Sequence, residues 1–199
     1  MSYENKRIAG LLVFAGAAQF VLAIVISEAV YSGYSVGQQY ISELGDWSKA
    51  GNSALIWNAS VILLGLLVIA GAYFLQRELK NRLFTSILAI GGVSWVGVGM
   101  VSLNTFRLLH VSFGWIGIGF WWASVIMSYR FEKSPFSYVS LILGAMIPLA
   151  TILLGSGFLL GLGLGGMQRF IIYPLLLWLL GFGAYLIGDS SDTAIIRKA

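Results

Sequence analysis

Six apolar stretches, each long enough to cross a lipid bilayer, constrain the fold of this chain more than any other feature. A helix needs roughly 20 residues to cross about 30 Å of hydrocarbon at 1.5 Å per residue. The stretches lie at residues 8–29, 54–75, 83–103, 108–127, 136–154 and 170–187. Inside lipid such runs satisfy their backbone hydrogen bonds only as helices, because barrel strands are about half as long and alternate in polarity. The sequence therefore predicts an all-α bundle of six transmembrane helices that forms a single domain over residues 1–199.

The composition agrees with a membrane protein and narrows its chemistry. Hydrophobic residues make up 58% of the chain and charged residues only 10%, whereas about 25% of the residues in a soluble domain are charged. The chain has no cysteine, which excludes disulfides, thiolate metal sites and thiol redox chemistry. A single histidine, His110, disfavours a two-histidine haem site and a His-rich zinc site. The sequence thus indicates no metal site and no cofactor.

Basic residues predict how the chain is oriented. Most of the 12 Lys and Arg residues lie on the side that holds both termini, namely Lys6, Arg7, Arg77, Lys80, Arg82, Arg130, Lys133, Arg197 and Lys198. The loops on the opposite side hold Lys49, Arg107 and Arg169. By the positive-inside rule, both termini of this multi-pass protein are expected in the cytoplasm, with the spans in the cell membrane. No basic, aromatic-interleaved surface suggests a nucleic-acid partner.

Two long loops lie on the predicted outer side. Residues 30–53 form a connection that is too long for a simple turn and is rich in Tyr, Gly and Ser. We expect it to be either a cap that anchors in the lipid headgroups or a lid over a site. Residues 155–169 are rich in glycine but lack the flanking strand and the Gly-Lys-Ser/Thr of a phosphate-binding loop. We expect a flexible interfacial connector that is re-entrant or folded back.

Polar residues within the spans are candidates for buried contacts or for a site. Gln19 lies near the middle of the first span, where an amide in hydrocarbon needs a partner. It is predicted to join two helices or to contact a ligand. Asn58 lies one turn into the second span from the outer side, and Glu28 ends the first span at the same level. In the fourth span, a stripe of small and polar residues from His110 to Ser128 is predicted to face the bundle.

The densest polar cluster follows the third span. Asn104, Arg107 and His110 lie in one short outer turn and at the start of the fourth span. If a helix begins near Leu108, Arg107 and His110 are three residues apart and project on one side. Because histidine titrates near neutral pH, His110 is a candidate general base, although a lone histidine is more often a structural hydrogen-bonding residue.

Short motifs are distributed over the first four spans. They are the run Tyr40-Ile-Ser42-Glu43-Leu-Gly45, the pair Trp57-Asn58, the glycines from Gly91 to Gly99, and His110. This pattern resembles a prokaryotic family of six-helix membrane proteins known as domain of unknown function 998, and the resemblance extends over almost the whole chain. It implies a six-span fold whose distinctive residues gather at the outer mouth, here Ser42, Glu43, Gly45, Asn58 and His110. It implies no activity.

Binding of a lipid or other amphiphile in an outward-facing cleft is the function that these residues favour. Arg107 and Arg169 would contact a phosphate or carboxylate headgroup, and the tail would lie along the small-residue stripes. The other candidate ligand-binding residues are Gln19, Asn58 and Asn104. Membrane lipids are thus the expected partners, and the sequence points to no particular protein partner.

Two alternatives remain open at the level of sequence. One is an intramembrane lipid-modifying enzyme, in which His110 acts as general base on water or on Ser42 and is oriented by Glu43 or Asp46. That hypothesis requires residues from separate loops to meet in space. The other is a structural subunit of a membrane complex or a small-molecule transporter.

Overall fold

The computed structural model describes the backbone of residues 2–196 and the side chains of residues 4–189. Over that range the chain forms six α-helices and a short 3-10 helix, η1, and no strand. The helices are α1 (Ser2–Val30), α2 (Asn52–Leu79), α3 (Arg82–Met100), α4 (Arg107–Ser128), α5 (Phe136–Gly155) and α6 (Gly163–Ile196), and η1 spans Ile41–Gly45. All six helices are long and apolar enough to cross a membrane. The prediction of an all-α bundle with six spans is confirmed.

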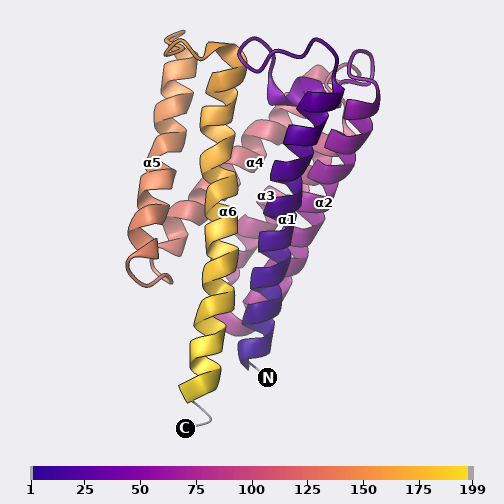
Figure 1. The fold of residues 1–199 in the computed structure, drawn as a ribbon. Coiled ribbons are helices and arrows are strands. Elements are labelled where there is room, and N and C mark those ends of the chain that lie inside the picture. Colours follow the sequence, from indigo (N-terminus) through magenta and orange to yellow (C-terminus); the bar gives the residue numbers. More distant parts are fainter. Residues whose placement is uncertain (1, 197–199) are drawn as a thin grey trace.

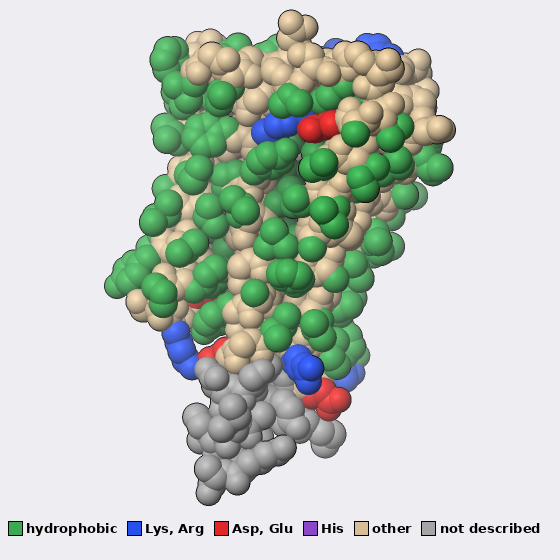
Figure 2. Space-filling view, viewed as in Figure 1, with side chains coloured by type: hydrophobic (Ala, Val, Ile, Leu, Met, Phe, Trp, Pro, Cys, Tyr) green, Lys and Arg blue, Asp and Glu red, His purple; other side chains and the backbone are tan. Residues whose placement is uncertain are grey.

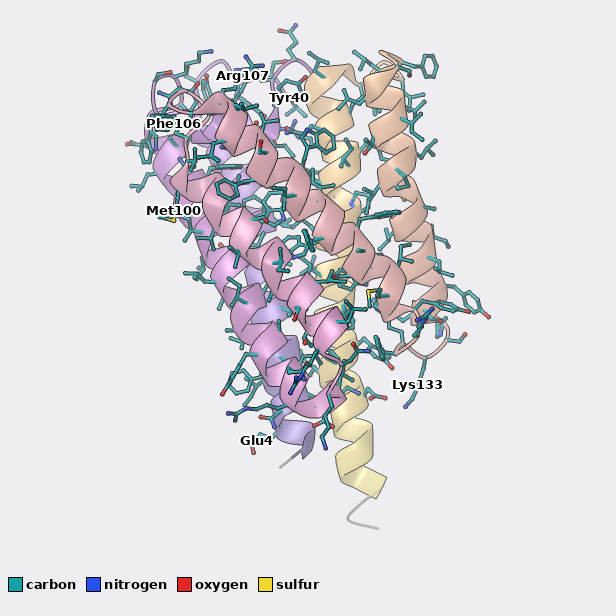
Figure 3. All side chains as sticks on the ribbon, turned by 180° about the vertical axis from the view of Figure 1, so that it is seen from behind. Glu4, Tyr40, Met100, Phe106, Arg107 and Lys133 are labelled. Atoms are coloured by element: carbon teal, nitrogen blue, oxygen red, sulfur yellow. The ribbon has the colours of Figure 1, made fainter. Side chains whose placement is uncertain are left out.

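The helices form an up-and-down bundle in which most sequence neighbours pack side by side. Helix α1 packs between α2 and α6, α3 packs against α2, and α5 packs against α6 (Figure 1). Both ends of the described chain lie at one end of the bundle, which we call the terminal end. Residues 31–51, 101–106 and 156–162 lie at the other end, which we call the loop end. Helix α4 crosses the bundle obliquely, beside α3 at the loop end and approaching α5 toward the terminal end (Figures 1 and 3).

Glycines allow the helix backbones to approach closely. A Cβ at Gly65 of α2 would lie 2.5 Å from the carbonyl oxygen of Gly92 in α3. A Cβ at Gly10 of α1 would lie 2.6 Å from the carbonyl oxygen of Gly183 in α6. Small residues have this role in membranes because lipid offers no hydrophobic drive between helices, so close packing has to supply the attraction. Figure 2 shows the outward surface of α1, α5 and α6 covered with hydrophobic side chains, with charged groups toward its two ends.

At the loop end, two helix boundaries differ from the predicted spans by three residues or more. Helix α3 ends at Met100 and not at Leu103, because Val101 takes an extended backbone conformation. Helix α6 begins at Gly163 and not at Phe170, so the prediction of a glycine-rich connector over residues 155–169 is wrong for its second half.

The glycines at the start of α6 serve a close approach between two parts of the chain. A Cβ at Gly163 would overlap the carbonyl of Gly37, and a Cβ at Gly165 would overlap that of Gln39. The amide of Gly165 also donates to the Gly37 carbonyl at 3.0 Å. The long 31–51 loop therefore rests directly on the first turn of α6, and Arg169 belongs to this helix and not to a loop.

Candidate functional site

A cavity of about 280 Å³ lies at the loop end of the bundle. All six helices contribute to its wall, and residues of the 31–51 loop and η1 cover it. Its polar lining comes from Tyr40, Ser42, Arg107, His110 and Gln168. The remaining lining is mainly aromatic and aliphatic, so the cavity combines a polar end with apolar walls.

His110 is held in one orientation at the start of α4. Its side chain is buried, and Nδ1 lies 2.6 Å from the main-chain carbonyl oxygen of Val101. Because a carbonyl can only accept, we assign the proton of the neutral ring to Nδ1. The main-chain carbonyl of Val98 also lies within hydrogen-bonding reach of the imidazole. The imidazole also lies beside Trp57, with 6.4 Å between the ring centroids.

Arg107 and Ser42 line the same cavity from different elements, α4 and η1. Arg107 is the first residue of α4 and is exposed, and its guanidinium forms no hydrogen bond or ion pair with any residue whose side chain the structure describes. Ser42 lies in η1, whose first amide, that of Ile41, donates to the Gln168 side chain at 2.6 Å. Figure 3 shows Tyr40 and Arg107 together at the loop end. The cavity lining therefore combines a hydrogen-bonded polar segment with an arginine whose charge no described residue compensates.

Two buried tryptophans that line the cavity have unsatisfied indole groups. Trp57 is 2% exposed and Trp95 is 5% exposed. Neither Nε1 has a hydrogen-bond partner among the described residues, although a buried indole N–H usually finds one. Both Nε1 atoms are enclosed by protein, and that of Trp95 lies against Gly117 of α4. The donors that a ligand can reach are therefore the Arg107 guanidinium and the Ser42 hydroxyl.

Glu43, Asn58 and Asn104 do not line the cavity but shape the loops above it. The Glu43 carboxylate accepts from the amide of Tyr40 at 3.0 Å and closes the first turn of η1. Asn58 Nδ2 donates to the carbonyl of Gly45 at 2.9 Å, and Ser102 Oγ donates to the same carbonyl at 3.3 Å. Ser102 also bonds Asn104. These contacts join η1, α2 and the α3–α4 turn into one unit.

Arg169 forms a buried ion pair outside the cavity. Its Nη2 lies 2.6 Å from Glu28 Oε1 and 2.7 Å from the Tyr34 hydroxyl, and its Nη1 donates to the carbonyls of Val36 and Gly165 at 3.0 and 2.9 Å. We call Arg169, Glu28 and Tyr34 the Arg169 cluster. Burial raises the pKa of Tyr34 above its ordinary value. The Arg169 guanidinium is therefore used to attach the 31–51 loop to α1 and α6.

Gln19 joins α1 to α2 by hydrogen bonds, which is the first of the two roles that the sequence predicts for it. Its Nε2 donates to the main-chain carbonyl of Ser60 in α2 at 2.9 Å, and the Ser60 hydroxyl bonds its Oε1. It does not line the cavity. Of the residues singled out in the sequence, the structure thus gathers Ser42, Arg107 and His110 around one space.

Comparison with known proteins adds a family to this geometry. The profile of the family described as "Protein of unknown function (DUF998)" matches residues 14–185. The chain belongs to the DUF998 family. This match confirms the resemblance found in the sequence motifs. No curated protein and no solved structure matches this DUF998 protein significantly.

Sequence reasoning missed several lining residues of this DUF998 protein. The sequence motifs include Trp57 without assigning it a role, and no sequence pattern points to Trp95 or Gln168. A usable signal existed for α4, because His110, Gly114 and Ile118 recur at four-residue spacing and all line the cavity. The indole groups and Gln168 offered no such signal, since their meeting depends on how α2, α3 and α6 pack.

Proposed function

We propose that this DUF998 membrane protein binds an amphiphile with an anionic headgroup in the loop-end cavity. The observation that carries the proposal is an arginine without a partner in a cavity whose polar lining also includes Ser42 and His110. Arg107 would contact a phosphate or carboxylate through two parallel hydrogen bonds. The Ser42 hydroxyl would donate to a remaining acceptor atom.

The apolar lining supports a ligand with a hydrocarbon part. Phe20 of α1, Val98 of α3 and Ile171 of α6 are buried and face the same space. On the α4 side the cavity reaches the surface, because two of its lining residues, Val111 and Trp115, are 38% and 47% exposed. A pocket with apolar walls and a few convergent polar groups is the usual form of a small-molecule site, and about 280 Å³ is just below the usual volume of about 300–1,000 Å³.

The orientation of the protein follows from the basic residues. The terminal end holds most of the Lys and Arg residues, so we place it in the cytoplasm and the loop end on the outer side of the cell membrane. The ligand would then be a lipid or other amphiphile of the outer leaflet.

An enzymatic function has less support than binding. Ser42 and His110 line one cavity, but the Glu43 carboxylate bonds the Tyr40 amide and does not orient the imidazole. The Nδ1 of His110 donates to a main-chain carbonyl, so only Nε2 could act as a base. A general base acts within about 2.6–3.2 Å of the proton that it removes, and no described contact joins Ser42 to His110.

Lipid selectivity in nanodiscs tests the proposal. The full chain is reconstituted with phosphatidylcholine plus a few per cent of phosphatidylglycerol, and retained lipids are measured by native mass spectrometry. We expect phosphatidylglycerol to be enriched, and Arg107→Gln to reduce its affinity about tenfold, the scale of a lost charge-assisted hydrogen bond.

Lys49→Gln is the matched control. Lys49 is also a cation of the loop end, but it is exposed and does not line the cavity. Equal losses for the Arg107 and Lys49 variants would mean that surface charge alone attracts the lipid. No enrichment in the native protein would overturn the proposal.

A further inference from the structure

A second hollow of about 240 Å³ continues from the cavity along the outside of the bundle. It lies between α4 and α5, and we call it the α4–α5 groove. Trp115 and Ile118 of α4 line both spaces, so the cavity and the groove are adjacent. The groove is further lined by Gly119, Trp122, Ile147, Pro148, Thr151 and Ile152. This lining is almost wholly apolar, in contrast to the polar end of the cavity.

The groove is closed toward the terminal end by direct contact of the two helices. A Cβ at Gly144 of α5 would lie 2.7 Å from Ile126 of α4. One turn away, Trp122 Nε1 donates to the Gly144 carbonyl at 2.9 Å. Figure 3 shows α4 meeting α5 near the terminal end and lying apart from it at the loop end. The groove thus begins at the cavity and ends where α4 and α5 meet.

The length of this path fits one hydrocarbon chain. Twelve residues separate His110 from Trp122, a rise of about 18 Å along an α-helix. One leaflet accounts for about half of the roughly 30 Å hydrocarbon thickness of a bilayer. A lipid of the loop-end leaflet with its headgroup at Arg107 would therefore extend its chain about as far as the end of the groove.

We propose that the α4–α5 groove holds the acyl chain of an anionic lipid, which reaches the cavity sideways from the bilayer between α4 and α5. This inference rests on the proposed function and names its ligand class, a phosphate-bearing lipid and not a free phosphate. Leaving the bilayer gives the chain no hydrophobic gain. The groove therefore selects ligands by shape, while the headgroup supplies the affinity.

Glycine at position 119 makes the groove easy to block without disturbing the fold. A Cβ at Gly119 would meet nothing within 4 Å, so Gly119→Leu projects into open space and not into a neighbouring helix. Gly155, at the end of α5, is also surrounded by open space and lines neither hollow. Gly155→Leu is therefore the matched control.

Photocrosslinking measures the position of the chain directly. The full protein is placed in phosphatidylcholine nanodiscs with phosphatidylglycerol that carries a diazirine either near the carbonyl or near the end of one acyl chain. We expect the first probe to label α4 near Gly114 and the second to label Trp122 and residues 147–152. Excess inorganic phosphate should not reduce either yield. Gly119→Leu should reduce labelling by the second probe about tenfold, the effect of steric overlap in a packed site, and Gly155→Leu should leave it unchanged.

The outcomes separate this inference from the proposed function. Labelling at Gly114 by the first probe, together with labelling scattered over all lipid-facing helices by the second, would retain headgroup binding and overturn the groove assignment. Loss of both localised signals would overturn both proposals, and competition by inorganic phosphate would replace the lipid with a free anion. If the groove instead receives a second copy of the chain, Gly119→Leu would change the mass of the assembly in native mass spectrometry and leave both labelling patterns unaltered.

Discussion

Trp122 of α4 donates its indole N–H to the main-chain carbonyl of Gly144 in α5, across 2.9 Å. An ordinary residue at position 148 would donate to this carbonyl from four residues later in the helix, but Pro148 has no N–H. The indole thus supplies a donor where the helix lacks one, and it joins two helices in doing so. A proline inside a membrane helix is tolerated when a neighbouring helix satisfies the freed group in this way.

Replacing Trp122 with Phe should destabilise the protein. The loss should be about 1 kcal/mol in the free energy of unfolding, the usual value for one hydrogen bond, measured by denaturant unfolding in a fixed detergent. In a Pro148→Ala background the loss should shrink, because the alanine N–H can pair with the Gly144 carbonyl. Trp115→Phe is the control, since no hydrogen bond of the Trp115 indole occurs among the described residues. The same loss in both backgrounds would show that the indole does not substitute for the missing amide.

The Arg169 cluster predicts a larger effect at the loop end. Arg169→Met leaves the Glu28 carboxylate without its cation, and removal of one partner of a buried ion pair costs about 3–5 kcal/mol. The 31–51 loop should also become sensitive to protease, because two of its carbonyls lose a donor.

The double variant Arg169→Met, Glu28→Gln should recover part of this stability, since it removes the uncompensated charge. Stability can be measured by thermal unfolding, and the protease sensitivity of the 31–51 loop by limited proteolysis of the same detergent-solubilised samples. Equal stability of the single and double variants would contradict an electrostatic role for the pair.

Glu132 predicts a pH dependence of stability at the terminal end. It lies between α4 and α5, is 8% exposed, and accepts from Trp178 Nε1 at 3.4 Å. Burial raises the pKa of Glu132 above its ordinary value. The folded protein therefore keeps this proton to a higher pH than the unfolded chain does. The stability that the protonated carboxyl contributes is present at low pH and is lost as pH rises through the folded-state pKa.

Glu132→Gln should remove this dependence, because an amide does not ionise. Melting temperatures of the native protein and of the variant, compared at several values from about pH 4 to pH 8, should differ most at the upper end, where the variant is the more stable. Glu4→Gln changes an exposed carboxylate of α1. It should leave the change of melting temperature with pH the same as in the native protein. A native protein that becomes more stable with rising pH relative to Glu132→Gln would contradict the sign.

The fold was predictable because each transmembrane helix is encoded locally. Hydropathy and length identify six spans without knowledge of their neighbours, and the structure confirms all six. The start of α6 was not predictable in this way. Its glycines indicate flexibility when considered alone, and only the approach of Gly37 to Gly163 shows that close packing requires them.

The site was predictable only in part for the same reason. Arg107 and His110 are three residues apart on one helix, so their common side follows from sequence spacing, and both line the cavity. The pairing of Arg169 with Glu28 joins positions 141 residues apart, which no local pattern encodes. The sequence predicts Arg169 at a lipid headgroup, but its guanidinium forms hydrogen bonds with Glu28, Tyr34 and main-chain carbonyls of the protein itself.

Gly114 offers a test that separates binding from stability. It lines the cavity in the middle of α4, and a Cβ there would meet nothing within 4 Å. Gly114→Leu should therefore fill the cavity and reduce phosphatidylglycerol retention at least about tenfold. It should also stabilise the protein by about 0.5–1 kcal/mol, because leucine favours a helix over glycine. Gly188→Leu on α6, also in open space, should give the stabilisation without the loss of lipid. If Gly114→Leu retains lipid as the native protein does, the ligand does not occupy this cavity.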